Sequence, residues 1–360
     1  MGTFRFEIDE LAIPAAPGAS GWPDFEAANQ LHSVVESEAY GTTELALTAE
    51  DLLPGWLHQT WEHKRLFVAR VAERIVGRGQ YETLPEDSAE HAWLAVEVLP
   101  AYRGRGIGSA LFARLEALAH AEGRGVQIVY TPSPDSPGER LPSPTGFGSV
   151  PLGNPEVRFL QGRGYRLEQV VRASRLALPV DPAELRRLSQ EAAAHAGPDY
   201  SVLQWVDRTP PHWLPDRALL YTRMSTDAPS AGLAEPEQIW TPERIAWEEQ
   251  KAAAGTRTSL TSAVLHGPSG HLVGFTDLEV PAESRRAVSQ GDTLVLREHR
   301  GHRLGMLLKA ANLDLLAAER PGHPSVTTFN AEENRHMLAV NEAIGFAPMG
   351  YEGAWRRDAD

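Results

Sequence analysis

The feature that most constrains the fold is a glycine-rich segment at residues 94–122. It reads LAVEVLPAYRGRGIGSALFARLEALAHAE, in which an apolar run is followed by a turn and then by Leu111, Leu115 and Leu118 at helical spacing. This pattern predicts a strand, a tight turn and an amphipathic helix. In such a turn several backbone N–H groups and the positive end of the helix dipole point at one small volume, and glycines let a ligand approach the backbone. The segment therefore predicts a phosphate-binding turn.

The spacing of the glycines excludes two common phosphate-binding turns. A dinucleotide-binding turn has the pattern G-x-G-x-x-G, and a P-loop has G-x-x-x-x-G-K followed by Ser or Thr. Here Arg103 is followed by Gly106 and Gly108, which gives R-x-x-G-x-G. A purely structural glycine turn is the alternative interpretation.

The same pattern returns later in the chain. Residues 292–305 read DTLVLREHRGHRLG, so that Arg300 is equivalent to Arg103, 197 residues earlier, and Arg303 stands where the first copy has Gly106. Each copy also closes alike, with FLQGRGY at 159–165 and VNEAIGF at 340–346. A repeat at about one domain length predicts two tandem domains.

These motifs resemble the GNAT family of acyl-CoA transferases. The R-x-x-G-x-G turn with its lead-in VLPAY at 98–102 is similar to the family's pyrophosphate loop, and the helix-Gly-aromatic close is similar to the motif after its fifth strand. The resemblance covers nearly the whole chain and is to tandem, two-domain actinobacterial enzymes of the mycothiol synthase type. It implies the α/β (α+β) fold class, with two tandem GNAT folds, each a mixed, mostly antiparallel central sheet flanked by helices.

The domain organisation follows from the repeat. We predict an N-terminal GNAT domain at 1–178, a helical connector at 179–199 and a C-terminal GNAT domain at 200–360. Thr241 followed by Pro242 predicts a helix start, and residues 262–266 and 272–280 predict a hairpin. Residues 132–155 are dense in proline and glycine, so no regular element is expected there. We interpret them as a substrate-shaping loop, with a plain surface loop as the alternative.

Composition excludes several function classes. The chain has no cysteine, which excludes disulfides, thiolate metal sites and an acyl-cysteine intermediate, so acyl transfer is expected to be direct. A net charge of −14 argues against nucleic acid and suits a neutral or cationic acceptor. No apolar run is long enough to span a membrane, and residues 1–7 lack the layout of a secretion signal. We expect a cytoplasmic monomer or homodimer with no metal.

The resemblance implies acetyl-CoA, or another acyl-CoA, as the cofactor. In the family the fourth and fifth strands splay apart, pantetheine lies in the gap, and a backbone N–H of the fourth strand supports the oxyanion. In the first half the implied binding residues are Val96, Val98, Arg103, Gly104, Arg105, Gly106, Ile107, Gly108 and Ser109. In the second half they are Val295, Arg300, Gly301, His302, Arg303, Leu304, Gly305, Met306, Asn330, Asn334 and Asn341. Asn334 fits a helix cap equally well.

Transfer to an amine needs a base for the amine and an acid for the departing thiolate. The candidate bases are Glu90, His91 and Glu97 in the first half and Glu279 and Asp292 in the second. Many GNAT enzymes place an acidic tyrosine five residues before the aromatic of the close, where this chain has Leu160 and Asn341. The acid is therefore expected to be water or a tyrosine elsewhere, with the candidates Tyr130, Tyr165 and Tyr351.

The resemblance thus implies an acyl-CoA-dependent N-acyltransferase, first of all an acetyltransferase, that acts on a primary amine of a small molecule in a ternary complex. The absent tyrosines keep a second class open, a non-catalytic acyl-CoA-binding or sensing protein. The sequence leaves open which half is catalytic.

Overall fold

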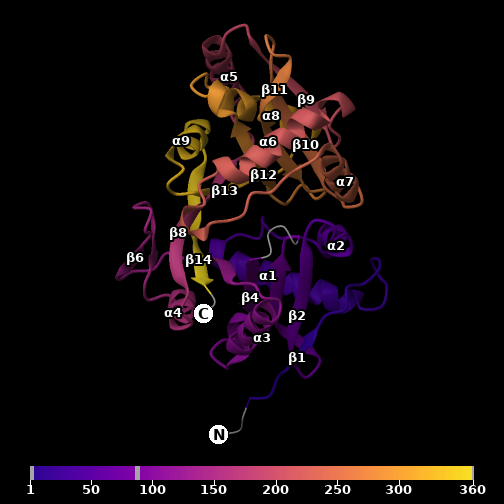
Figure 1. Cartoon of the computed structure of the whole chain (residues 1–360), viewed down its shortest axis with the longest axis vertical. Coiled ribbons are helices and arrows are strands. Elements are labelled where there is room, and N and C mark those ends of the chain that lie inside the picture. The colour runs from indigo at the N-terminus through magenta and orange to yellow at the C-terminus, as the bar shows by residue number, and fades with distance from the viewer. Residues whose placement is uncertain (1–3, 86–89, 359–360) are drawn as a thin grey trace. The chain divides into compact units, whose positions relative to one another are not determined.

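The computed structural model describes residues 4–85 and 90–358. Residues 1–3, part of the segment on which the prediction about secretion rests, lie outside the described residues. The chain forms two compact units (Figure 1). Unit 1 takes its residues from Met1–Val171, Ser230–Glu235 and Gly350–Asp360, and unit 2 from Arg172–Pro229 and Pro236–Met349.

Unit 1 is built on a sheet in the order β1-β2-β3-β4-β5-β14. Neighbouring strands pair antiparallel except β4 and β5, which are parallel. The strands are β1 (Glu7–Glu10), β2 (His63–Val71), β3 (Arg74–Thr83), β4 (His91–Val98), β5 (Val126–Pro132) and β14 (Ala347–Asp358). The helices are α1 (Trp22–Tyr40), α2 (Ala49–Leu57), α3 (Ile107–Ala121) and α4 (Pro155–Gly162).

Helices cover both faces of this sheet. Successive strand residues point to opposite faces, so Gly77 and Gly79 of β3 share one face and Arg78 lies on the other. A Cβ at Gly77 would lie 2.9 Å from Ile107 and one at Gly79 would lie 3.5 Å from Leu111, so α3 packs closely on the glycine face. Contacts of α1 with β3 and β4, described below, cover the opposite face.

Unit 2 repeats this plan, as the sequence predicted. Its sheet has the order β8-β13-β12-β11-β10-β9, with β12 and β13 parallel. The strands are β8 (Arg166–Ala177), β9 (Tyr200–Val206), β10 (Thr258–His266), β11 (His271–Val280), β12 (Val288–Val295) and β13 (Ser325–Ala331). Residues 166–171 of β8 belong to unit 1. The helices are α5 (Pro182–Ala196), α6 (Leu214–Asp227), α7 (Pro242–Ala252), α8 (Leu304–Glu319) and α9 (Arg335–Ile344). The predicted cap and hairpin are confirmed, because the Thr241 hydroxyl accepts from the Arg244 N–H and β10 pairs with β11.

In each unit a parallel pair of strands is joined only at its start. β4 and β5 pair over His91–Trp93 and Val126–Ile128, after which β4 runs on to Val98 without a β5 partner. β12 and β13 pair only at Val288–Ser289 and Val326–Thr327. The sheet of unit 1 therefore opens between β4 and β5, and that of unit 2 opens between β12 and β13. The backbone groups of the later β4 and β12 residues on the open side are left for another partner.

Two segments differ from the expectations. Residues 132–155 contain a short antiparallel hairpin, β6 (Arg140–Pro142) and β7 (Ser149–Pro151), so the prediction that they hold no regular element is wrong. The Arg140 side chain holds this hairpin by donating to the Ser149 hydroxyl and carbonyl. Residues 182–196 are helical as predicted, and Leu185 and Leu188 are buried in the core of unit 2, so α5 is an integral part of that unit.

Unit 1 is completed by two segments from far along the chain. Residues 352–358 of β14 pair with β5, and Trp355 is fully buried in the unit 1 core. Residues 230–235, which we call the strap, place Leu233 against Val126, Ile128 and Ala354. The repeat at 197 residues gives no sign of either segment, because both join unit 1 through pairing and burial at long sequence separation.

Candidate functional site

The two glycine loops have the same backbone conformation. In unit 1, Gly104 and Gly106 have φ of 72° and 85°, and in unit 2 Gly301 and Arg303 have φ of 86° and 54°. Neither α3 nor α8 has a side-chain cap, so the N–H groups of each first turn are left for an external acceptor. Arg303 adopts the left-handed conformation despite its side chain, which costs a non-glycine residue roughly 1–2 kcal/mol.

The equivalent arginines brace these loops. Arg103 Nε donates to the Val98 carbonyl at 3.0 Å and its guanidinium also bonds Glu38 at the end of α1. Arg300 Nε donates to the Val295 carbonyl at 3.0 Å and its guanidinium bonds Asp227, at the end of α6, at 2.7 Å. The guanidinium groups of both arginines, which are among the implied cofactor-binding residues, are thus engaged within the protein, and the loop N–H groups are the donors that stay available.

Other predicted cofactor residues fall into two groups. The side chains of Ile107, Leu304 and Met306 are buried in the two cores, so these residues can offer a ligand only their backbone. The loop positions that are exposed or half-buried are Gly104, Arg105, Gly106, Gly108, Ser109, Gly301, His302, Arg303 and Gly305. Arg105 lies over the Phe4 ring at 4.7 Å, and the His302 ring lies 5.1 Å from the ring of Tyr200.

A cavity of about 110 Å³ lies in unit 1 where β4 and β5 stop pairing. Strands β3, β4 and β5 supply its lining residues, which are Gln80, Glu82, Trp93, Leu94, Ala95, Ile128 and Tyr130. The strap reaches the same place, because Glu235 accepts hydrogen bonds from the Tyr130 hydroxyl at 2.8 Å and from Trp93 Nε1 at 3.3 Å. The cavity therefore has aromatic walls and carboxylates beside them.

An ion-pair network links α1 to the strands beside this cavity. His32 Nδ1 lies 2.6 Å from Glu97 Oε1, and Arg78 Nε lies 3.3 Å from Glu97 Oε2. Arg78 also donates to Gln80, a lining residue, at 2.8 Å. Burial alone would raise the pKa of Glu97, but Arg78 and His32 bring that pKa below its ordinary value. Glu97, a predicted base, is therefore a weaker base than a free glutamate.

Two further glutamates next to this network were not predicted. Burial raises the pKa of Glu36 to about 7, and Glu36 Oε2 is buried without a hydrogen-bond partner in the described part of the chain. Burial also raises the pKa of Glu352 on β14, whose carboxylate accepts from the Tyr40 hydroxyl at 2.5 Å. The recurrence of His32, Glu36 and Tyr40 every four residues on one helix face is the signal that could have found Glu36.

Of the remaining predicted groups of unit 1, Glu90, His91, Tyr165 and Tyr351 are not lining residues of the cavity. Glu90 is exposed just before β4, and its carbonyl accepts from the Val126 N–H. His91 is buried with its ring stacked on Trp93, and burial lowers its pKa, which favours the neutral imidazole. Tyr165 is buried in the core and donates to Gln127 at 2.8 Å, and Tyr351 packs against the same core. Of the candidate tyrosines, Tyr130 alone lines the cavity.

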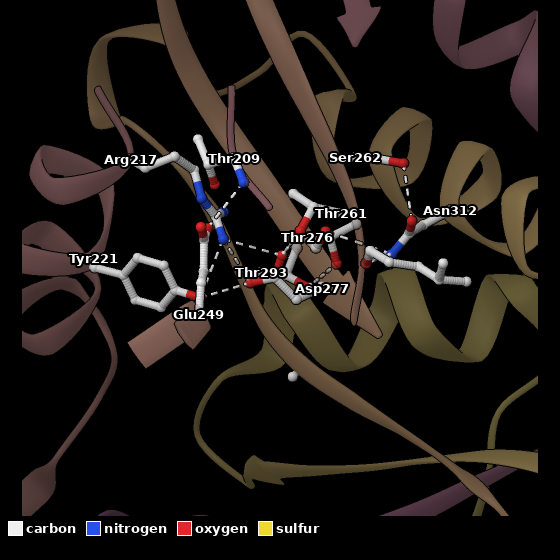
Figure 2. A network of polar contacts seen from close by, with 12 residues as sticks. Thr209, Arg217, Tyr221, Glu249, Thr261, Ser262, Thr276, Asp277, Thr293 and Asn312 are labelled. Carbon is white, nitrogen blue, oxygen red and sulfur yellow. Dashed lines mark hydrogen bonds and ion pairs between the residues drawn. The ribbon is translucent and has the colours of Figure 1, made fainter. Parts of the chain in front are cut away.

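In unit 2 the corresponding place holds a buried network (Figure 2). Gly77 pairs with Val98 in unit 1, and Gly274 pairs with Val295 in unit 2, so Gly274 is equivalent to Gly77. Three residues further along each strand, Asp277 is equivalent to Gln80. Asp277 accepts from Arg217 at 3.3 Å through both oxygens, from Tyr221 at 2.9 Å and from Thr261 at 2.6 Å. Arg217, from α6, is 4% exposed and lies over the Phe275 ring at 4.3 Å. Polar side chains of unit 2 itself therefore fill this position.

The predicted bases of unit 2 flank this network. Burial raises the pKa of Glu279 to about 7 and that of Asp292 to about 6, and the charge of Asp277 acts in the same direction on both. Both carboxyls have proton affinities suited to a base near neutral pH. The Asp277 ion pair with Arg217 stands beside them.

The asparagines of unit 2 bond within the protein. Asn334 caps α9, its side chain accepting from the Met337 N–H at 3.3 Å, which is the alternative interpretation given above. Asn341 is 1% exposed and donates to Asn330 at 2.8 Å. The amides predicted to hold pantetheine are therefore directed at one another and at a helix end.

Two features are absent from the described residues, a metal-binding cluster and a membrane-spanning helix. Across 4–85 and 90–358, no group of three or more His, Asp or Glu side chains is arranged to hold a metal ion. Within the same ranges, no helix has both the length and the apolar character needed to cross a membrane.

Comparisons with known proteins agree with this geometry. Residues 30–137 match the family model described as acetyltransferase (GNAT) family. A tandem GNAT protein from the clavulanic acid biosynthesis pathway, solved without AcCoA, has 24% identity and a TM-score of 0.72, covering 99% of both chains. A GCN5-related N-acetyltransferase from Sphaerobacter thermophilus has 15% identity and a TM-score of 0.59, covering 98% of this chain and 95% of its own.

A third structure is a GCN5-related glucosamine N-acetyltransferase region of a fungal multi-domain GH3 β-N-acetylglucosaminidase. It has 14% identity and a TM-score of 0.60, and the match covers 99% of this chain and 38% of that one. No curated protein matches the sequence. At these identities the likeness shows the fold alone, and the finer resemblance to mycothiol synthase stays a prediction.

Proposed function

This chain has the tandem GNAT architecture, and from it we propose that the protein is an acyl-CoA-dependent N-acyltransferase. The proposed reaction transfers an acetyl group from acetyl-CoA to a primary amine of a small molecule, by direct attack in a ternary complex. The observation that carries the proposal is the opening between β4 and β5, with an uncapped glycine loop following β4 and a cavity where the strands stop pairing.

The residues of the loop fit an acyl-CoA. A Cβ at Gly104, Gly106 or Gly305 would meet no heavy atom within 4 Å, so space for a ligand lies directly over the backbone there. The first-turn N–H groups of α3 and α8 would hold the pyrophosphate, and the unpaired edge of β4 at Val96 and Val98 would face the pantetheine. When bound, acetyl-CoA supplies an activated acyl group.

Unit 1 is the half that we propose to catalyse. Gln80 of its cavity accepts from Arg78, whose charge acts on Glu36, a buried carboxylate with a pKa of about 7. We assign to Glu36 the removal of a proton from the acceptor's ammonium group. Tyr130, the tyrosine in the cavity lining, is the proposed proton donor to the departing thiolate. In unit 2 the equivalent position is filled by Arg217 and Asp277.

The alternative, a non-catalytic acyl-CoA-binding role, is favoured for unit 2. Its loop keeps the conformation of the first copy, including positive φ at Gly301 and Arg303, while its acceptor side is closed by the buried network. We propose that unit 2 binds acyl-CoA without transferring its acyl group.

The test uses Gly108→Trp and Gly305→Trp, equivalent positions that need no positive φ. A Cβ at Gly108 would lie 3.7 Å from the Val98 side chain, an ordinary contact, and one at Gly305 would meet no heavy atom within 4 Å. Calorimetric titration of acetyl-CoA should find two sites in the wild type, with one lost in each variant. Because the chain has no cysteine, a thiol reagent reports only released CoA, and release with an amine should be lost in Gly108→Trp alone. Gly108→Ala is the control and should keep both. Absence of acetyl-CoA binding in the wild type would overturn the proposal.

A further inference from the structure

The cavity of unit 1 combines aromatic rings with carboxylates in a way that indicates its ligand. We propose that it is a cation-binding acceptor subsite completed by the strap, and that the acceptor is an aliphatic diamine or polyamine. This inference rests on the proposed N-acyltransferase function and names the class of its amine substrate. One ammonium group of such a molecule would be held in the subsite while another reacts.

The aromatic walls are held in place for this purpose. Trp93 on β4 and Tyr130 on β5 both line the cavity, and both donate to the same oxygen of Glu235. Faces of Trp and Tyr rings attract ammonium groups, and a carboxylate beside the rings adds to the attraction. An anionic ligand would be repelled by the same groups. The cavity therefore selects for positive charge.

Negative charge around the cavity exceeds the cations that face it. Glu82 lines the cavity, and burial raises its pKa, as it does for Glu36 and Glu352. The cations Arg78 and His32 are both directed at Glu97. Lys64, the cation next to Glu82, lies 2.9 Å from Glu62. An ammonium group entering the cavity would compensate carboxylates whose charged form is disfavoured by burial.

The size of the cavity limits the ligand. About 110 Å³ is less than the roughly 150 Å³ of an engineered cavity that binds benzene. A linear chain of a few methylene groups with a terminal ammonium fits this volume, whereas an aromatic amine or a protein side chain with its backbone is less well matched. The apolar lining residues Ala95 and Ile128 would contact the methylene groups.

The strap positions Glu235 rigidly. Leu233 is fully buried, and Arg356 of β14 donates to the Gly232 carbonyl at 2.9 Å and to the Leu233 carbonyl at 3.3 Å. A Cβ at Gly232 would lie 2.1 Å from Glu168 Oε2, so the strap lies close against unit 1. A carboxylate fixed in this way loses little freedom when it binds a cation. The strap therefore makes Glu235 a specificity-determining residue of a site whose other residues come from the first half of the sequence.

The experiment titrates 1,4-diaminobutane and butylamine separately into the whole chain, without acyl-CoA, by calorimetry. The two amines share a four-carbon chain and differ by one ammonium group. We expect the diamine to bind at least tenfold more tightly. Glu235→Gln should weaken diamine binding at least tenfold and leave butylamine within about threefold, whereas Glu237→Gln, the same change at an exposed strap neighbour, should leave both amines unchanged.

The outcomes separate this inference from the proposed function. Equal binding of the two amines, or equal effects of Glu235→Gln and Glu237→Gln, would overturn the cation subsite. If Glu235→Gln proves unstable, Tyr130→Phe is the second variant, because it removes one donor to Glu235 and keeps the ring. Tyr130→Phe should weaken diamine binding about threefold or more, and unchanged diamine binding in this variant would also overturn the cation subsite. Thiol release from acetyl-CoA with an uncharged-tail amine but not with diamines would sink the inference and leave the proposed function standing. Tight diamine binding without any acetyl-CoA binding would overturn the proposed function and leave the cation subsite standing.

Discussion

The buried network of unit 2 gives a prediction that tests both its energetics and its role. In Asp277→Asn the side chain keeps its shape and loses its charge. The hydroxyls of Tyr221 and Thr261 can rotate to accept instead of donate, so they adapt to either amide orientation. The Arg217 guanidinium cannot adapt, because it only donates and is 4% exposed. The cost of the substitution therefore falls on an unpaired buried cation.

The magnitude follows from that burial. Removing one partner of a buried ion pair costs about 3–5 kcal/mol, whereas replacing both partners is often nearly neutral. Asp277→Asn should lower the free energy of unfolding of unit 2 by about 3–5 kcal/mol. The double variant Arg217→Met/Asp277→Asn, which no longer contains the unpaired cation, should be more stable than the single variant by about 1–3 kcal/mol.

Hydrogen–deuterium exchange is the suitable assay, because a chain of two units need not unfold in one step. Protection should fall in β11 of unit 2 and stay unchanged in β3 of unit 1. A loss below 1 kcal/mol, or a double variant less stable than the single one, would refute the energetic reasoning. Under conditions where the variant stays folded, CoA release should equal that of the wild type. Lost turnover in a folded variant would refute the assignment of catalysis to unit 1.

Three further predictions follow from single residues. Glu36→Gln should lower kcat/KM for the amine about 100-fold or more. Glu36 works as a base only when deprotonated and its pKa is about 7, so wild-type kcat/KM should rise with pH through about 7 and the variant should lack that rise. An unchanged pH profile in the variant would contradict the assignment. Arg303→Gly should raise the free energy of unfolding by up to about 1 kcal/mol, because the strain of a left-handed arginine is removed while glycine gives the unfolded chain more conformational freedom. Gly106→Arg should lower the free energy of unfolding for the opposite reason. Thermal unfolding measures both changes. Trp355→Ala should reduce exchange protection in β4 by about 3–5 kcal/mol and leave β11 unaffected; equal loss in both strands would contradict the placement of Trp355 in the unit 1 core.

The features that were predictable from the sequence are those set by local conformation. Gly104 and Gly106 are needed for positive φ, and the following leucines form one helix face, so strand, turn and helix could be located from spacing alone. The Thr241 cap and the β10–β11 hairpin were predictable for the same reason. The domain ranges 1–178, 179–199 and 200–360 were inferred from the repeat. They stay a prediction of two domains and a connector.

The features that escaped prediction depend on long-range pairing. Glu36, Glu235 and Glu352 come from α1, the strap and β14, and each is an ordinary polar residue in its own segment. They are linked because the charge of Glu352 acts on Glu36 and also on Tyr130, the partner of Glu235. The bracing roles of Arg103 and Arg300 were hidden because the acidic partners at the ends of α1 and α6 carry no motif. A basic residue in a glycine loop is as well suited to a carboxylate as to a phosphate, and the sequence does not distinguish the two.

The C-terminal strand has a consequence for how the protein is made. Unit 1 contains residues 350–358 of β14, so its sheet and the burial of Trp355 are incomplete until these residues have been translated. At roughly 5–20 residues per second, the ribosome needs on the order of 10–35 s to pass from Val171 to Gly350. During that time the free edge of β5 is open to other strands. The two copies are therefore not interchangeable modules, and a gene cut between them would deliver an unfinished first unit.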